Sequence, residues 1–467
     1  MILNPLASPA VEAMFSRYSI LACVFLATGS CGKRQVANPP RVPFEAPAYW
    51  VWHRSSRLTG KELSELHHAG TKRLCWQAVE CGWKDGKWDA VRISKSFPRP
   101  EGIAVIPVFR IKPDTAFLEN PDAAKALGRL FTLWADGATY QELQIDLDCP
   151  VRLLDRYGKF LRELGEHVAP AEISITALAS WPQHPDFLKL ARSVRSMAPM
   201  FYDLYADAPG EVRENRFQPL ADKRTRELIE AWSACPVPWQ AGLPNFERVT
   251  LYDKDGKLAG HLRNWSHDRL FFHESLKASP LGEGVTLYQA DRDCRLDGTE
   301  IPEGSKVIHR LPDAEVLASL QASAERAGAM GVIYFALPGP GMRAAYSAGH
   351  LAGHPAPRLE VCFDKSGAIV LSNRGGSDLP PNATTGGWRL EVKAEGMGKF
   401  RSGPPGEFAR LTVPGNAPPE LASNLVLHFS KLESGGSITS AALLTNGHSL
   451  RWSLAGTDME GTVKPKE

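Results

Sequence analysis

Eight short apolar segments alternate with longer amphipathic stretches between residues 49 and 336, and this alternation limits the fold more than any other feature of the sequence. The segments predicted as strands are residues 49–52, 73–79, 104–109, 142–148, 172–178, 196–202, 236–240 and 331–336. Strands that alternate with helices form parallel α/β sheets, and eight of them favour a closed (β/α)8 barrel over residues 45–340. The alternative is an open, doubly wound sheet, although no Gly-x-Gly-x-x-Gly sequence follows the first strand.

The chain has 467 residues, which is more than this barrel needs, and two further regions are expected. Residues 244–310 form an insertion after the seventh strand, with hairpin-like runs around a turn at Asp255-Gly256. Loops at that edge of a barrel commonly shape the substrate site. Residues 341–357 indicate a linker, and residues 358–467 contain short alternating runs that predict a small all-β sandwich.

The beginning of the sequence indicates export. The apolar run at residues 20–27 is long enough for the core of a signal peptide but too short to span a bilayer. Residues 27–31 resemble a bacterial lipobox, in which small residues precede an acylated cysteine, although the usual leucine is absent. We therefore predict a signal peptide over residues 1–30, lipidation of Cys31 and a tether over residues 31–44. The expected location is the periplasm or the cell surface, with an outer-membrane anchor if the cell is Gram-negative.

Composition and motifs argue against several other classes of protein. The net charge of +2 gives no basic field that would attract nucleic acid. The sequence has no Cys-x-x-Cys pair, His-rich spacing, His-Glu-x-x-His, phosphate-binding loop or Gly-x-Ser-x-Gly. We therefore expect neither a metal ion nor another cofactor.

The strongest chemical signal is the fourth predicted strand, residues 142–148. Because strand side chains alternate, Glu142, Gln144, Asp146 and Asp148 share one face, which in a barrel is the lumen. Unpaired carboxylates in a lumen are costly, and the last two lie at the strand end where barrel enzymes place their catalytic groups. Two neighbouring carboxylates also raise one pKa, as acid–base catalysis requires. The alternative is that they form ion pairs with a lumen residue such as Arg110.

Two family resemblances add to this interpretation. Residues 145–148 (Ile-Asp-Leu-Asp) resemble the fourth-strand motif of family 18 chitinases, in which an Asp-x-Asp-x-Glu run ends in the catalytic acid. Pro150 stands at the position of that Glu, so this chain is not a chitinase of that mechanism. The sequence also resembles the bacterial domain-of-unknown-function family 3142, at residues 144–148, 154–157, 173–181 and 194–202. That resemblance implies a glycosidase-type barrel but no particular catalytic residue.

Other predicted strand ends supply further candidates. Glu80, after the second strand, is either a proton donor or nucleophile, or a solvated charge. Trp181 is placed either to stack on a sugar or to fill the core, and Asp203 either to orient a substrate or to cap the next helix. The expected substrate-binding residues are Trp52, Arg110, Trp181, Tyr202, Asp203 and Gln240.

These features favour a glycoside hydrolase that acts on an envelope or extracellular polysaccharide. Asp148 or Glu80 would be its acid, Asp146 would position or polarise the substrate, and a second carboxylate must lie opposite them. The main alternative is a non-catalytic, glycan-binding lipoprotein with a degenerate barrel, which Pro150 supports. A third hypothesis is a structural envelope lipoprotein whose barrel is only a scaffold, because a barrel fold does not fix function.

Overall fold

The computed structural model describes residues 43–463, except residues 55, 95–99, 338–342, 383–385, 397, 401–403, 416–421, 443 and 446–448. The predicted signal peptide, Cys31 and the tether up to residue 42 therefore lie outside the described residues. No helix in the described part of the chain is both long and apolar enough to cross a membrane.

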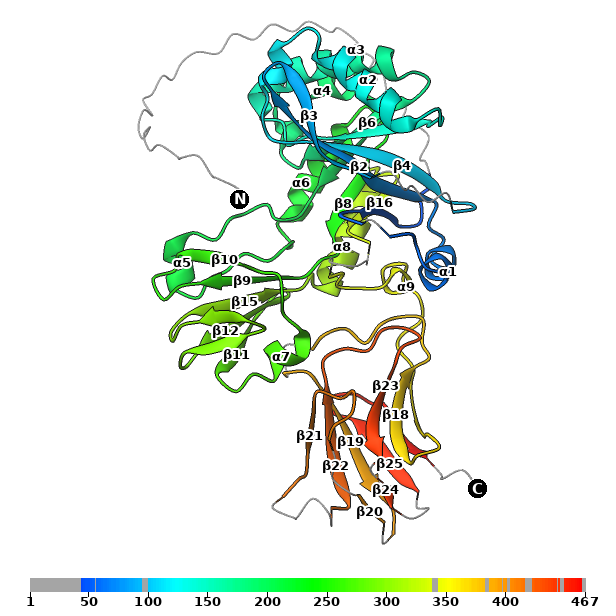
Figure 1. Ribbon diagram of the computed structural model, residues 1–467, viewed down its shortest axis with the longest axis vertical. Coiled ribbons are helices and arrows are strands. Elements are labelled where there is room, and N and C mark those ends of the chain that lie inside the picture. Colours follow the sequence, from blue (N-terminus) through cyan, green and yellow to red (C-terminus); the bar gives the residue numbers. More distant parts are fainter. Residues whose placement is uncertain are drawn as a thin grey trace, which may run out of the picture. The chain divides into compact units, whose positions relative to one another are not determined.

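Eight parallel strands of the described chain form a closed barrel (Figure 1). They are β1 (Ala48–Val51), β2 (Arg73–Lys84), β4 (Ala104–Ile111), β5 (Glu142–Asp146), β6 (Glu172–Leu178), β7 (Ser196–Met200), β8 (Gln240–Pro244) and β16 (Gly331–Phe335). The sheet closes because β1 pairs with β16 on one side and with β2 on the other. The predicted (β/α)8 barrel is therefore confirmed, and the open sheet is not formed.

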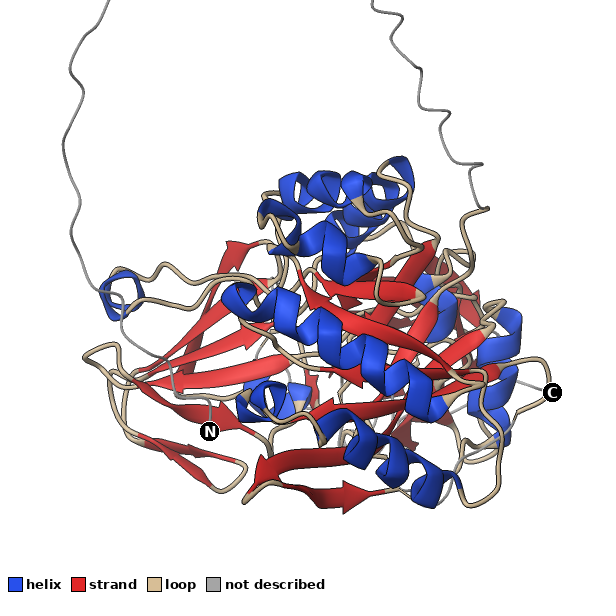
Figure 2. Ribbon diagram, turned by 90° about the horizontal axis from the view of Figure 1, so that it is seen from above, coloured by secondary structure: helices blue, strands red, loops and turns tan. Residues whose placement is uncertain are grey.

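Helices follow the barrel strands and lie against them (Figure 2). The helix α3 shows why, because Leu154, Leu161 and Val168 recur along one stripe and are all buried. Strand residues that point outward, such as Ile145 and Ile175, share one core with this stripe. The helices of the barrel are α1 (Gly60–His68), α2 (Ala123–Ala135), α3 (Leu154–Val168), α4 (Phe187–Ala191), α6 (Thr225–Ala231) and α8 (Ala314–Arg326). The short helix α5 (Pro209–Arg213) instead lies against the insertion, where Val212 packs with Tyr252 and Leu287.

Two strands differ from the prediction. The seventh barrel strand begins at Gln240 rather than ending there. The predicted strand contained Pro236 and Pro238, which lack the amide hydrogen that a strand ladder needs, so the strand starts only after them. The strand β2 continues to Lys84 and forms a hairpin with β3 (Lys87–Ile93), which the prediction missed. Positive φ angles at Asp85 and Gly86 form its two-residue turn.

The predicted insertion between β8 and α8 is an antiparallel sheet with the strand order β10-β9-β15-β12-β11. Its own core contains Val249, Trp265, Leu270, Tyr288 and Val307. Its elements are β9 (Arg248–Tyr252), β10 (Leu258–Leu262), α7 (His267–Phe271), β11 (Leu276–Gly282), β12 (Val285–Ala290), β13 (Cys294–Leu296), β14 (Thr299–Ile301) and β15 (Lys306–Arg310). The insertion follows the carboxyl end of β8, which is the end of a barrel where substrate sites form.

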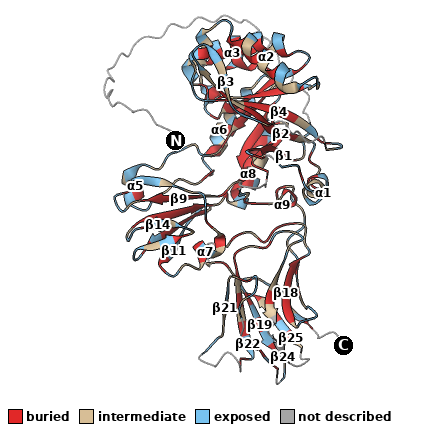
Figure 3. Cartoon of the chain, viewed as in Figure 1, coloured by how far each residue is buried: buried red, intermediate tan, exposed pale blue. Residues whose placement is uncertain are grey.

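The C-terminal part contains a three-stranded and a five-stranded antiparallel sheet that share one apolar core. In β19 the buried Leu390, Val392 and Ala394 alternate with exposed Arg389, Glu391 and Lys393 (Figure 3). The predicted all-β sandwich is confirmed. The elements after the barrel are α9 (Ala348–Leu351), β17 (Leu359–Phe363), β18 (Ala368–Asn373), β19 (Trp388–Ala394), β20 (Lys399–Phe400), β21 (Arg410–Thr412), β22 (Asn424–Phe429), β23 (Ser437–Ala442), β24 (Leu444–Thr445), β25 (Leu450–Leu454) and β26 (Glu460–Val463).

Candidate active site at the barrel mouth

The polar residues on the inner face of β5 differ in their partners. Those at the start of the strand form close hydrogen bonds inside the lumen, whereas Asp146, at its end, faces the barrel mouth. Glu142, at the start of the strand, forms a buried ion pair with Arg73 of β2, with Nη1 to Oε2 at 2.9 Å. The next inward residue, Gln144, accepts a hydrogen bond of 2.7 Å from the indole of Trp50. Both side chains are thus satisfied within the lumen, and packing explains their presence.

Asp146 ends β5 at the barrel mouth, where its partners are weaker. Thr176 of β6 donates a 2.7 Å hydrogen bond to Oδ1, and Nε of Arg110 lies 3.8 Å from Oδ2. The side chain is only 14% exposed, and this burial raises its pKa to about 6. Repulsion from Asp148 and Glu80 adds to the rise, while Thr176 and Arg110 oppose it. Asp146 therefore exchanges its proton close to neutral pH.

Asp148 follows the strand and is exposed at the same mouth. The surrounding protein desolvates its carboxylate, which raises its pKa, and the Arg110 guanidinium partly offsets this effect. Arg110 lowers the pKa of both aspartates, and the charge of Asp148 raises that of Asp146, so the protonation of Asp146 depends on the state of Asp148.

A third carboxylate, Glu80, reaches the mouth from β2. It is half-buried and lies in register with Arg110, which in turn lies in register with Asp146. Neighbouring strands are about 4.8 Å apart, so the backbones of Glu80 and Asp146 are separated by roughly 10 Å around the barrel. A second carboxylate is therefore present on the same rim, with a cationic side chain between the two.

Aromatic side chains form one wall of this mouth. The ring of Tyr202 stacks on Phe335 with centroids 5.8 Å apart, and Phe246 and Trp52 pack on these rings through their edges. Burial raises the pKa of Tyr202 well above its usual value, and the charges of Asp146 and Asp148 raise it further. The phenol thus lies in the field of both aspartates.

Two buried donors lie beside this wall without a partner in the described part of the chain. They are Nε1 of Trp52 and Nε2 of Gln77. Gln77 is anchored through its oxygen, which accepts a 3.1 Å hydrogen bond from the amide of His53. Buried donors without partners are costly, and a polar ligand or water at the mouth would satisfy them.

Three predicted site residues are not part of this group. Trp181 is fully buried and packs edge-on against Tyr157 in the core between barrel and helices, so no ring face is open to a ligand. Gln240 is buried at the opposite, amino end of the barrel because it begins its strand. Asp203 forms two hydrogen bonds of 2.5 and 2.6 Å with Arg248, which join the end of β7 to the insertion.

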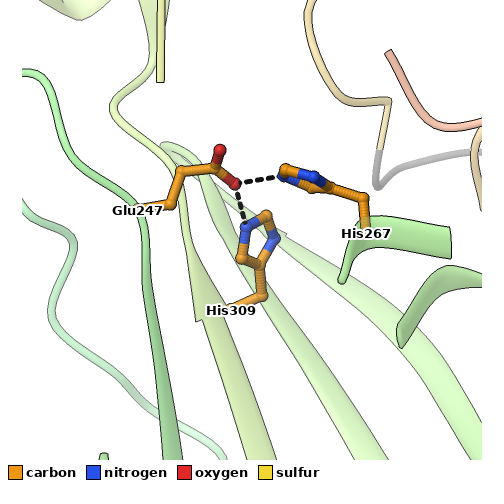
Figure 4. A group of neighbouring side chains, drawn as sticks. All are labelled: Glu247, His267 and His309. Carbon is orange, nitrogen blue, oxygen red and sulfur yellow. Dashed lines mark hydrogen bonds and ion pairs between the residues drawn. The ribbon is translucent and has the colours of Figure 1, made fainter. Parts of the chain in front are cut away.

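A second group of chemically active side chains lies in the insertion, where no sequence motif predicted one. Figure 4 shows the imidazoles of His267 and His309 converging on one oxygen of Glu247. The two Nε2 atoms lie 2.6 and 2.7 Å from Oε2, and all three side chains are buried. The three residues are far apart in the sequence and come from a loop, a helix and a strand, so no local spacing could have shown them.

Residues 99–261 match the model of a protein family described as Domain of unknown function (DUF3142). The matched segment comprises 163 of the 467 residues, and the predicted resemblance is confirmed for this part of the chain. The matched segment supplies Arg110, Asp146, Asp148 and Tyr202 to the mouth, whereas Glu80 lies before it.

No curated protein matches the chain, whereas several solved structures are similar to it. The spore cortex-lytic enzyme SleL of Bacillus megaterium QM B1551 has 12% identity and a TM-score of 0.44, covering 65% of this chain and 72% of that one. Chitinase ChiW of Paenibacillus sp. str. FPU-7 has 10% identity and a TM-score of 0.48, covering 90% and 56%. Catalytic domain 2 of the Group II chitinase of Ostrinia furnacalis has 10% identity and a TM-score of 0.42, covering 63% and 90%.

The mouth also contains residues that the sequence prediction missed. Phe335 ends the last barrel strand, beyond the segment that matches the family model, and Phe246 follows β8 within that segment. Gln77 was overlooked because it lies inside an apolar run, although its inward face follows from strand alternation with Cys75. The face on which each of these side chains lies could not be read from the position of its strand end alone.

Proposed function

We propose that this protein is a glycoside hydrolase and that the barrel mouth is its active site. The observation that carries the proposal is the group of three carboxyl groups at this mouth, two of which, Asp148 and Asp146, have raised pKa values. A group with a pKa near the working pH is effective both as a proton donor and as an acceptor. Glycosidic bonds are cleaved by such carboxyl pairs across a barrel or groove.

The proposed roles follow from exposure and position. Asp148 is the most exposed carboxyl group and donates a proton to the glycosidic oxygen, because its raised pKa helps it to retain that proton. Asp146 holds and polarises the sugar, since it is anchored by Thr176. Glu80 is the opposing base. Inverting pairs lie about 6.5–9.5 Å apart and retaining pairs about 5–5.5 Å, so the distance between the carboxyl groups of Asp148 and Glu80 would decide the stereochemical outcome.

The substrate class in this proposal is an envelope or extracellular polysaccharide. Tyr202 and Phe335 offer aromatic surfaces to the apolar faces of sugar rings, and the free donors of Trp52 and Gln77 suit hydroxyl oxygens. A location outside the cytoplasm fits such a substrate. We therefore also propose export and a lipid anchor at Cys31, supported by the apolar run at residues 20–27.

One observation favours a second function, which is glycan binding without catalysis. Pro150 occupies the position at which the resembled chitinase motif has its acid, and it begins a short helical turn with no acidic group there. The aromatic wall and the free donors would still bind a glycan. In that case Asp146 and Asp148 would bind the glycan through hydrogen bonds and would not transfer protons.

A polysaccharide screen with the soluble protein from Gly32 onward tests the first function. Released reducing ends are measured for the wild type and for Asp148→Asn, Asp146→Asn and Glu80→Gln. Glu163→Gln, an exposed substitution on α3, is the matched control. We expect release by the wild type and by the control, and a loss of about 100-fold or more in the site variants. Binding without release from any glycan would favour the second function.

A further inference from the structure

We propose that Glu247, His267 and His309 form a binding site for a divalent transition-metal ion of the zinc class. This site lies in the insertion, and nothing in the proposed glycosidase chemistry uses it. The three ligand atoms lie within 4.8 Å of one another, which is a separation that one ion can bridge. The proposal stands independently of the barrel-mouth function.

The geometry needs only a small adjustment to hold zinc. Zinc bonds to imidazole nitrogen and carboxylate oxygen are about 2.0–2.1 Å long and tetrahedral, so neighbouring ligand atoms lie about 3.4 Å apart. The present contacts of Glu247 Oε2 with the two Nε2 atoms are 2.6 and 2.7 Å. Each must therefore lengthen by less than about 1 Å, which side-chain rotation alone provides.

An unsatisfied atom distinguishes this group from a purely structural hydrogen-bonded cluster. Both imidazoles share Oε2 of Glu247, while Oε1 is buried and has no hydrogen-bond partner in the described part of the chain. The side chain of Glu247 is 0% exposed, so bulk water does not compensate for the missing partner. A cation beside the carboxylate would neutralise its charge and compensate this buried oxygen.

The two imidazoles are held in place by aromatic packing. The ring of Trp265 lies 5.0 Å from His267 and 5.3 Å from His309, and Phe271 contacts both from a distance of 5.6 and 5.8 Å. Arg343 stacks over Trp265 at 4.4 Å. Ligands whose rotamers are fixed by their neighbours lose little freedom when an ion binds, so the site is preorganised.

The ligand chemistry selects the kind of ion. Two imidazoles with one carboxylate suit zinc and similar late transition metals, whereas calcium and magnesium prefer oxygen ligands only. Three protein ligands leave a fourth position of the tetrahedron open, as in zinc sites that bind water or a substrate.

A pocket lies next to the site. It has a volume of about 410 Å³ and is lined by Glu247 and His267, and of these two side chains only that of His267 is partly exposed, at 6%, so an ion would approach the site beside this imidazole. Carboxylates outnumber cationic side chains in this lining and favour cations there. The charged lining residues, apart from Glu247, are Glu62, Glu65, Asp378 and Glu433 against Lys61, Arg343 and Lys431.

Metal titration of the tag-free, chelator-treated protein from Gly32 onward tests the site. Zinc content is measured after equilibrium dialysis, and Co²⁺ is added as a spectroscopic probe whose visible absorption reports tetrahedral coordination. The ligand variants are Glu247→Gln and His267→Gln. The control is His261→Gln, at an exposed histidine of β10 that is hydrogen-bonded to Thr250 and lies outside the ligand set.

We expect about one equivalent of zinc, tetrahedral Co²⁺ bands, and a rise in Tm of about 5 °C at metal concentrations well above Kd. Affinity should fall by about 100-fold or more in both ligand variants and be unchanged in the control. Less than about a tenth of an equivalent in the wild type, or wild-type affinity in both ligand variants, would overturn the proposal. The Co²⁺ spectrum of the wild type tests the proposal even if a variant does not fold, because tetrahedral bands require an ion bound to the protein.

Discussion

The guanidinium of Arg110 lies 3.8 Å from the carboxylate of Asp146, on neighbouring strands and in register. The arginine is partly solvent-exposed, with 39% of its side chain accessible, so water screens its charge. Its attraction therefore does not cancel the effect of burial, and the pKa of Asp146 stays raised at about 6. Burial and the charge of Arg110 therefore together determine the pH at which Asp146 loses its proton.

Replacement of this arginine should shift the pH dependence upward. Arg110 lowers the pKa values of both Asp146 and Asp148, so Arg110→Gln should raise both. If the proposed hydrolase is active, a higher pKa of the acid Asp148 moves the alkaline limb of its pH profile to higher pH, and a higher pKa of Asp146 moves the acidic limb in the same direction. The pH profile of the released sugars checks this. An unchanged profile would mean that Arg110 does not control either carboxyl group.

Asp146→Asn should stabilise the fold at alkaline pH while it impairs function. The pKa of Asp146 is higher in the folded chain than in the unfolded chain, so its favourable contribution is complete below about pH 4 and is lost as pH rises through 6. At pH 8 the wild type must ionise this group in a buried place, which costs about 2–3 kcal/mol. Asparagine avoids this cost and still accepts the hydrogen bond from Thr176.

Denaturant unfolding of both proteins at pH 8 and at pH 4 measures this difference. The asparagine variant should gain about 2 kcal/mol at pH 8 and about none at pH 4. Equal stability of the two proteins at both values would show that Asp146 has an ordinary pKa.

Glu142→Gln should have the opposite effect on stability, although Glu142 lies on the same strand face. Its carboxylate is 5% exposed and pairs with Arg73, so the substitution leaves a buried cation without its partner. The expected loss is about 3 kcal/mol in the free energy of unfolding. Glu142 lies four residues before Asp146, at the other end of β5, so glycan binding by the folded fraction should not change. A stability within about 0.5 kcal/mol of the wild type would contradict this account.

The positions of most barrel strands could be predicted from the sequence, because these strands are short apolar runs bounded by turn residues. The predicted start of the seventh strand was wrong, because Pro236 and Pro238 have no amide hydrogen for the strand ladder and β8 begins only at Gln240. The sequence could identify Asp146 because alternation along a strand fixes the inward face. It could not place Trp181, because a single helical turn after a strand has no period from which a face can be deduced.

Residues that meet only in the folded chain were beyond sequence analysis. Glu247, His267 and His309 lie on three separate elements, and no spacing connects them. Glu80 was predicted from its strand end, but its separation from Asp146 follows only from the order β5-β4-β2 in the closed sheet. Tertiary pairing, and not local propensity, determines both groups.

The proposed lipid anchor predicts that a serine at position 31 changes the cellular location of the protein. Cys31→Ser removes the thiol that would be acylated, so the protein should move from the membrane fraction to the soluble fraction of its native host. Fractionation with metabolic labelling by a fatty-acid analogue measures this. Cys75→Ser, at a buried cysteine of β2, is the control and should remain labelled. Label on the Cys31→Ser protein would refute the assignment.

Tyr202 and Trp181 should respond in opposite ways to truncation. Tyr202→Ala removes one face of the aromatic wall at the mouth, so glycan affinity should fall by about 10-fold or more with little loss of stability, because the ring is only half-buried. Trp181→Ala creates a cavity beside Tyr157 in the core and should cost about 3–5 kcal/mol of stability. The folded fraction of Trp181→Ala should bind glycan as the wild type does, because the indole of Trp181 is fully buried and contacts no open space. Affinity electrophoresis and denaturant unfolding of both variants separate the two effects. A Trp181→Ala protein that is stable but has lost binding would return Trp181 to the site.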